Sequence, residues 1–132
     1  MNRQMLTEAV VLARRLGHYL VATANAAGQP HVAVANRLDE KPGGVVEVVG
    51  WFCPGTVENV DQNRPVSLVV WEKESDQGYQ IVGQVQDVRE MAIMDGYVPD
   101  ERLAGPQEEF SLAVRVDKVL RFRQGRHTDK EE

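Results

Sequence analysis

The segment GWFCPGTVENVDQN, residues 50–63, holds residue types that could together bind an anion. An apolar run stops within this segment, and we expect a short helix over residues 57–63, ended by Pro65. The first turn of a helix has amides without partners in the helix and a partial positive charge, which suits phosphate. Thr56 could donate its hydroxyl to such a ligand, and Gly55 would let the backbone approach closely. The alternative is a purely structural turn in which Thr56 only caps the helix.

Other residues with reactive side chains show no arrangement typical of catalysis. Cys53 is the single cysteine, so there is no C-x-x-C motif, and a buried apolar role is more common for such a residue than a reactive one. His18, His31 and His127 lack the spacing of metal ligands, and we predict no metal site. His31 could relay a proton, although a half-buried structural role is more common. No Ser-His-Asp order, P-loop or G-x-G-x-x-G motif is present. Catalytic residues therefore stay unassigned.

The composition limits the class of protein. The chain has 132 residues and a formal net charge of −5, which indicates one domain and argues against binding of nucleic-acid backbones. No apolar run is long enough to span a membrane, and the N-terminus has no signal-peptide pattern. A single cysteine is typical of a reducing compartment. We therefore expect a cytoplasmic protein without nucleic-acid or membrane partners.

Hydrophobic periodicity predicts the elements that position these residues. Leu6, Val10 and Ala13 recur at helical spacing and predict an amphipathic helix over Arg3–Leu16 that packs on the rest of the chain. Strands are expected at 18–25, 30–38, 45–52, 65–72, 79–88 and 110–123, with a loop at 39–44, a turn at 75–78 and a helix at 89–94. The acidic residues Glu72, Glu74 and Asp76 flank that turn and are expected to be a solvated rim. The pattern predicts a mainly β fold, a six-stranded antiparallel barrel with flanking helices.

The order and spacing of four pieces resemble the FMN-binding split-barrel family, the group that includes pyridoxamine 5′-phosphate oxidase. The pieces are VATANAAGQPHVAVANRL, VVGWFCPGTVENVDQNRPVSLVVW, YQIVGQVQDV and FSLAVRVDKVLRF. The most specific features are the turn at 28–30, Asn59 and the run at 63–68. The resemblance covers nearly the whole chain, which we take as a single split-barrel domain, residues 1–132.

The resemblance implies a homodimer with two FMN sites at the subunit interface. The isoalloxazine ring would lie along one strand at Ala33, Val34, Ala35 and Asn36, and along the next at Val49, Gly50 and Trp51. The phosphate would contact Thr56 and Val57, which gives the predicted helix a function. Trp51 and Trp71 could cover a flavin face, although core or interface roles are more common for tryptophan. The implied activity is that of a flavin-dependent oxidoreductase, with the chemistry supplied by FMN.

The sequence departs from the oxidase branch of this family at the phosphate site. That branch usually has an Arg-Lys pair where this chain has Gly55-Thr56, and basic residues where it has Ala33 and Leu38. Arg37 lies nearby but, by strand alternation, should face away from Leu38. Two alternatives therefore stay open. The protein could be a flavin-binding module or electron carrier without turnover, or a member of the fold that has lost flavin and binds another ligand.

Overall fold

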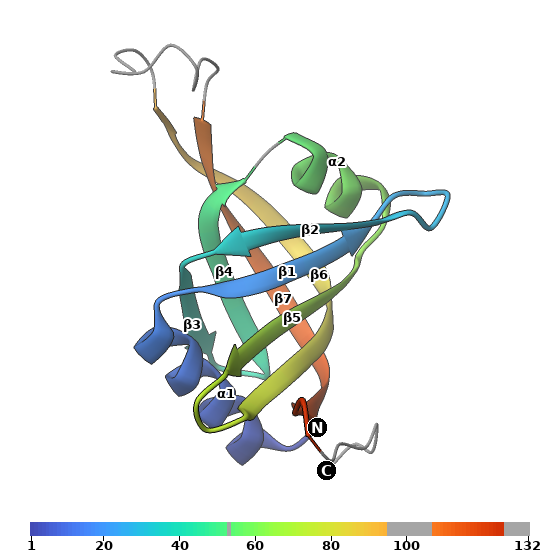
Figure 1. Cartoon of the computed structure of the whole chain (residues 1–132). Helices are drawn as coiled ribbons and strands as arrows, with labels where there is room; N and C mark the ends of the chain where they lie inside the picture. The colour runs from blue at the N-terminus through green and yellow to red at the C-terminus, as the bar shows by residue number, and fades with distance from the viewer. Residues whose placement is uncertain (53, 95–106, 126–132) are drawn as a thin grey trace.

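The computed structural model describes residues 1–52, 54–94 and 107–125, which form a curled sheet with two helices (Figure 1). The elements are α1 (Arg3–Leu16), β1 (Tyr19–Ala24), β2 (Pro30–Ala35), β3 (Arg37–Lys41), β4 (Val45–Phe52), α2 (Pro54–Gln62), β5 (Pro65–Glu72), β6 (Gln77–Met94) and β7 (Gln107–Phe122). Helix α1 lies at one end of the sheet and α2 at the other. Among the described residues, neither helix has the length and apolar composition that crossing a membrane requires.

The sheet has seven strands in the order β2-β1-β5-β6-β7-β4-β3, and every neighbouring pair is antiparallel. Its two edge strands, β2 and β3, are separated in the chain by Asn36 alone. The chain therefore passes directly from one edge of the sheet to the other, which curls the sheet into a barrel. The predicted antiparallel β-barrel is confirmed.

The number of strands in the prediction was wrong, because the segment expected as one strand at 30–38 is two strands. The alternation of buried and exposed residues breaks at Asn36 and Arg37, which are both exposed. Before this break β2 pairs with β1, and after it β3 pairs with β4. Leu38 then points into the core while Arg37 faces solvent, as predicted. The loop predicted at 39–44 is shorter in the structure and covers residues 42–44, because β3 continues to Lys41.

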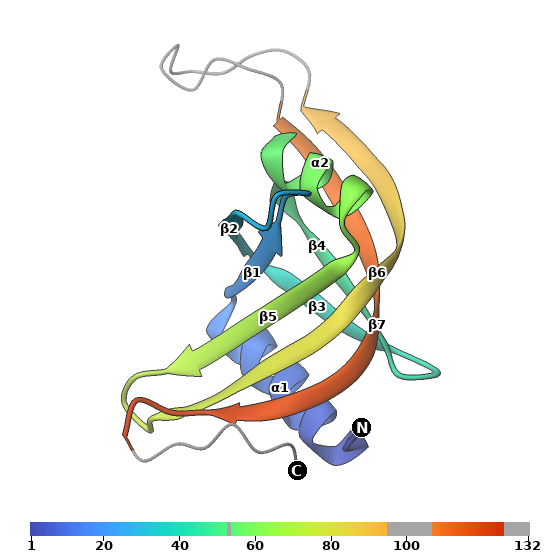
Figure 2. The same cartoon turned by 90° about the vertical axis from the view of Figure 1, so that its right-hand side faces the viewer.

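Helix α1 packs at the end of the barrel opposite α2 (Figure 2). Its predicted bounds are confirmed, and both ends are capped. The Asn2 side chain accepts a hydrogen bond from the Met5 amide at 3.0 Å, and Gly17 ends the helix in a left-handed conformation with φ 77°. Leu6 is among the buried residues of its apolar face, and the helix packs against β3, β5 and β6.

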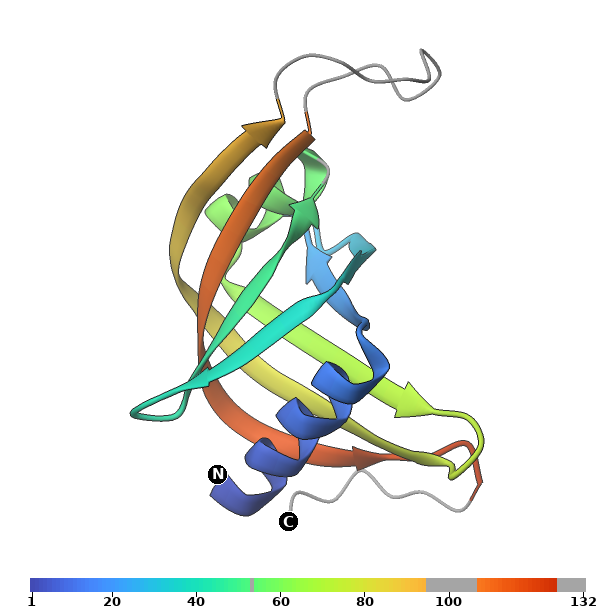
Figure 3. The same ribbon diagram turned by 90° about the vertical axis from the view of Figure 1, so that its left-hand side faces the viewer.

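Strands β6 and β7 are longer than predicted and pair along most of their length (Figure 3). The helix expected at 89–94 was wrong, because this segment continues β6 and pairs with residues 107–111 of β7. Three register shifts interrupt the pairing, at Val82/Gly83, Val85/Asp87 and Glu90/Ala92. Such bulges break the period-two alternation on which a strand prediction depends. The sequence of residues 97–109 is rich in turn formers and gave no clear prediction; 97–106 lie outside the described residues, and 107–109 begin β7.

Candidate functional site

Helix α2 begins three residues earlier than predicted, at Pro54. Proline suits the first helical position because its fixed φ is helical and its missing N–H would have no partner there. Thr56 is therefore the third residue of the helix, so the alternative in which Thr56 only caps the helix was wrong. The helix places the amides of Gly55, Thr56 and Val57 in its first turn, where a helix offers its own amides no acceptor.

The start of α2 lies against His31 of β2. The Thr56 side chain is buried, and its hydroxyl lies 3.4 Å from His31 Nδ1. A Cβ on Gly55 would lie 3.8 Å from Nε2 of the same imidazole. The ring of His31 therefore runs along the first turn of α2. The sequence placed His31 only beside the proposed flavin-ring strand, because the approach of α2 to β2 is a long-range contact that no local pattern contains.

Polar side chains hold α2 on the hairpin formed by β1 and β2. Asn59 Nδ2 donates to Thr23 Oγ1 at 3.1 Å. Asn63 Nδ2 lies 3.3 Å from the carbonyl oxygen of Ala24 and 3.4 Å from that of Asn25. Thr23 is buried, so its bond to Asn59 replaces a lost contact with water. We call this region, formed by the first turn of α2, His31, Thr23, Asn59 and Asn63, the closed end of the barrel.

The structure brings together the three segments that were predicted to hold FMN, since β2 contacts β4 and α2 contacts both strands. The side chains of these segments that the structure describes do not form one surface. On β2, Val34 is exposed on the outer side of the sheet, while Ala35 is buried on the inner side. Of the other two predicted positions, Ala33 is half-buried and Asn36 is exposed. On β4, Val49 and Gly50 are buried. The backbone of Trp51 pairs with Glu109, and the Trp51 side chain and Cys53 lie outside the described part of the structure.

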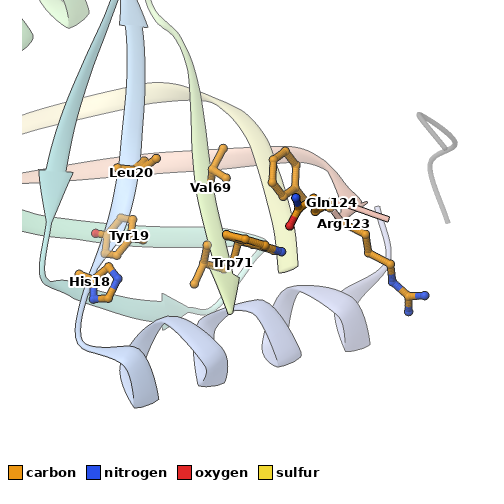
Figure 4. Close-up of a pocket in the computed structure, with 9 residues that line it drawn as sticks. His18, Tyr19, Leu20, Val69, Trp71, Arg123 and Gln124 are labelled. Carbon is orange, nitrogen blue, oxygen red and sulfur yellow. The ribbon is translucent and has the colours of Figure 1, made fainter. Parts of the chain in front are cut away.

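A concave region lies near α1, at the other end of strand β1 (Figure 4). This pocket has a volume of about 550 Å³. Its walls come from the start of β1, the end of β5 and the end of β7. The lining residues are His18, Tyr19, Leu20, Val69, Val70, Trp71, Phe122, Arg123 and Gln124. The sequence analysis named Trp71 among these residues. It gave no sign that the start of β1 and the ends of β5 and β7, which are far apart in the sequence, would meet around Trp71.

Asp76 fixes one wall of this pocket. Its carboxylate accepts hydrogen bonds from Trp71 Nε1 at 2.9 Å and from the amides of Gln124 and Gly125 at 2.7 and 2.9 Å. These bonds, from Gln124 first and then from Trp71 and Gly125, hold the pKa of Asp76 below its ordinary value. The expectation of a solvated acidic rim was therefore wrong for Asp76. Glu72 also has partners, Arg15 at 2.6 Å and Ser75 at 2.6 Å, while Glu74 is exposed.

An apolar area on the outer side of the sheet adjoins the pocket. Val32 and Val34 of β2 are 58% and 59% exposed, and Leu20 of β1 is 41% exposed. Leu20 pairs directly with Val34 on one side and with Val69 on the other, so the three side chains form a row across β2, β1 and β5. We call Leu20, Val32 and Val34 the outer apolar face.

Solved structures of similar fold include flavin and heme proteins. A Clostridium acetobutylicum protein related to general stress protein 26, of the pyridoxinephosphate oxidase family, is 15% identical with a TM-score of 0.66, over 99% of this chain and 96% of that one. A pyridoxamine 5′-phosphate oxidase-related, FMN-binding protein of Nostoc punctiforme is 8% identical with a TM-score of 0.64, over 92% and 84%. HutZ, the heme storage protein of Vibrio cholerae, is 15% identical with a TM-score of 0.54, over 89% and 92%.

These similarities show the fold, which is that of the pyridoxamine 5′-phosphate oxidase-like split barrels. No family model and no curated protein matches the sequence. Within residues 1–52, 54–94 and 107–125, no three His, Cys, Asp or Glu side chains lie together in a way that could hold a metal ion.

Proposed function

We propose that the protein binds FMN as a homodimer and acts as a flavin-dependent oxidoreductase. The observation that carries this proposal is the junction of α2 and β2 at the closed end. There the first-turn amides of a helix, a glycine and an imidazole occupy one place, on a fold that an FMN-binding protein of Nostoc punctiforme shares. Bound FMN would supply the redox chemistry, and the chain would bind and orient it.

The phosphate would be held at this junction mainly by backbone amides. The Arg-Lys pair of the oxidase branch is replaced by Gly55 and Thr56, so a strong charge-assisted clamp is missing. The Thr56 hydroxyl faces His31, and the contact predicted for Thr56 and Val57 would therefore come from their amides. His31 could add an imidazole N–H beside Gly55. Without a cationic pair we expect modest affinity and partial loss of FMN during purification.

The homodimer would form through the outer apolar face. Three large apolar side chains project from neighbouring strands there, and β2 is an edge strand. The predicted ring-binding residue Val34 belongs to this face, so a partner subunit that covers it would complete the flavin site. Light scattering should give twice the chain mass of 14.8 kDa. Val34→Glu should give a monomer, whereas Val11→Glu, at an exposed position of α1, should not change the mass.

The visible spectrum of the purified protein tests the proposal. We expect a flavin absorbance band that survives desalting in part and is restored by added FMN. Added FMN should also raise the melting temperature by mass action. The proposal would be contradicted by a protein that lacks this band, retains no flavin absorbance when it is desalted after addition of FMN, and shows no rise in melting temperature with FMN.

Two alternatives remain, and each predicts a different result. A flavin-binding module or electron carrier would hold FMN but would not turn over any substrate during steady-state assays. A fold member that has lost flavin would bind another ligand, and the similarity in fold to the heme storage protein of Vibrio cholerae supports this alternative. A heme absorbance band in place of the flavin band would favour this second alternative.

A further inference from the structure

We propose that the pocket between the ends of β1, β5 and β7 binds a planar aromatic ligand, and that Asp76 is the residue that positions its wall. The pocket lies near α1, whereas the proposed FMN phosphate site lies at α2, at the opposite end of the barrel (Figures 1 and 4). The inference does not depend on FMN binding, because it uses none of the residues of the closed end.

The lining gives the chemical class of the ligand. The Tyr19 side chain, which is 2% exposed, belongs to the core, and its hydroxyl donates to the carbonyl oxygen of Arg37 at 2.7 Å. Trp71 has its polar atom engaged outside the cavity, because it donates its indole N–H to Asp76 at 2.9 Å. It therefore offers a carbon surface to the pocket, beside Leu20, Val69 and Phe122. Such walls favour a flat ring system over a charged or strongly hydrated molecule.

Trp71 is fixed on two sides, which makes it a rigid wall. On one side Asp76 binds its indole nitrogen. On the other side is Gly78 of β6, where an added Cβ would lie 3.0 Å from Trp71 Cδ1 and 2.6 Å from the Val70 carbonyl oxygen. The indole therefore packs directly against a backbone that has no side chain at this point.

Asp76 is itself held in an unusual conformation. Its φ of 50° lies in the left-handed region, which glycine adopts more readily than aspartate. A glycine there would relieve strain but would lose all three hydrogen bonds of the carboxylate. The same carboxylate joins the turn between β5 and β6 to residues 124 and 125 after β7. Asp76 thus connects the two chain segments that carry Trp71 and Gln124 into the pocket wall.

The size and shape of the pocket suit a small molecule. The pocket is concave, and its volume of about 550 Å³ lies within the roughly 300–1,000 Å³ typical of small-molecule sites. The neighbouring Val32 and Val34 lie outside the pocket lining and are the part of the sheet that a second subunit would cover. Leu20 belongs to both regions, so the pocket opens at the border of the proposed dimer interface.

The experiment uses the 132-residue chain with two probes, lumichrome and metal-free protoporphyrin IX, and follows binding by amide chemical shifts. Lumichrome is the flavin ring system without its side chain, and the porphyrin is a larger planar ring. We expect at least one probe to shift the amides of 18–20, 69–71 and 122–124. The probe that binds more tightly identifies the kind of ring system. No shifts in these three segments with either probe would overturn the proposal.

Matched variants test the pocket itself. Phe122 is 39% exposed and lines the pocket, so Phe122→Ser should fold and should weaken probe binding about tenfold, which corresponds to roughly 1.4 kcal/mol. Val11 is 57% exposed on α1 and does not line this pocket, and Val11→Ser should leave probe binding unchanged. Equal affinity of the two variants would contradict the assignment.

Asp76→Asn tests the positioning role. It keeps the size of the side chain but removes the charge and one of the two acceptor oxygens that bind Trp71, Gln124 and Gly125. We expect a shifted indole N–H resonance of Trp71 and weaker probe binding, with FMN affinity unchanged. Unchanged resonance and probe affinity would overturn the role. Because FMN is titrated separately and read at the amides of 55–57, its failure to bind would contradict only the proposed function.

Discussion

The two ends of strand β1 are built from opposite chemistry. At the closed end, Thr23 is buried and its hydroxyl accepts a hydrogen bond from Asn59 of α2, next to the buried Thr56. At the other end, which holds the pocket lined by Leu20, Trp71 and Phe122 and which we call the open end, Leu20 is 41% exposed. The same six-residue strand therefore supports a polar junction that a helix covers and an aromatic cavity that is open.

The difference is consistent with the two proposed ways of binding. The closed end has few exposed side chains, so a ligand there would meet backbone amides and one imidazole, which suit an anion. The open end has carbon surfaces held rigid from behind by Asp76 and Gly78, which suit a ring. Substitutions that act at one end should therefore leave the other unchanged, and the following predictions use that independence.

The largest effect is expected from Gly78→Ala at the open end. The new Cβ would lie 2.6 Å from the Val70 carbonyl oxygen and 3.0 Å from Trp71 Cα, and backbone atoms cannot yield as a flexible side chain would. We expect a loss of stability of about 1–3 kcal/mol, measured by chemical denaturation, together with loss of probe binding in the pocket. Stability equal to that of the wild type would show that β5 and β6 do not approach each other as described.

Thr23→Val should have a smaller effect, at the closed end. It keeps the shape of the side chain but leaves the Asn59 amide without its acceptor, which should cost about 1–2 kcal/mol. Thr7→Val is the matched control, because the Thr7 hydroxyl bonds to Glu40 at an exposed position. The control should lie within about 0.5 kcal/mol of wild type. Equal losses of stability for Thr23→Val and Thr7→Val would contradict a specific stabilising role for the Thr23–Asn59 hydrogen bond.

Gly55→Ala should separate stability from binding at the closed end. Its Cβ would lie 3.8 Å from His31 Nε2, an ordinary contact, so the helix can accept it. We expect a gain of about 0.4–1 kcal/mol, because alanine restricts the unfolded chain more than glycine does. FMN affinity should fall, since the methyl group occupies the space beside the imidazole. Weakened FMN binding with no loss of stability would localise the phosphate, whereas unchanged affinity would place it elsewhere.

The smallest effect concerns pH and the open end. The pKa of Asp76 is lowered in the folded state, so its hydrogen bonds stabilise the fold above the ordinary aspartate pKa of about 3.9. This contribution is lost as the pH falls from there through the folded-state pKa. The difference in melting temperature between wild type and Asp76→Asn should therefore be constant near neutral pH and shrink below about pH 4. A difference that does not change with pH would contradict a bound, ionised carboxylate.

Much of the barrel was predictable because its strands carry their own periodic pattern. The bounds of α1, β4 and β5 followed from apolar spacing and from caps or prolines at their ends. The break at Asn36 could not be predicted in this way, because it depends on the pairing of β3 with β4. The continuation of β6 past Val88 could not be predicted either, because it depends on pairing with β7, which is distant in sequence. The FMN-binding role of the nine predicted positions stays a prediction.

The open end could not be predicted, for the same physical reason. Asp76 resembles any acidic residue of a polar turn until residues 124 and 125 are brought to it. His31 likewise became part of the closed end only through its contact with Thr56, 25 positions away in sequence. Both regions depend on side chains that meet across the barrel, and local sequence patterns carry no record of such contacts.

The most direct test of the proposed function is a pair of fluorescence titrations of the wild-type protein, one with FMN and one with riboflavin, which lacks the phosphate. If the first turn of α2 holds the phosphate, FMN should bind about tenfold or more tightly than riboflavin, since a hydrogen bond to a charged group contributes roughly 1.5–3 kcal/mol. Equal affinity would contradict the phosphate site, and the absence of binding by either compound would contradict flavin binding by this barrel.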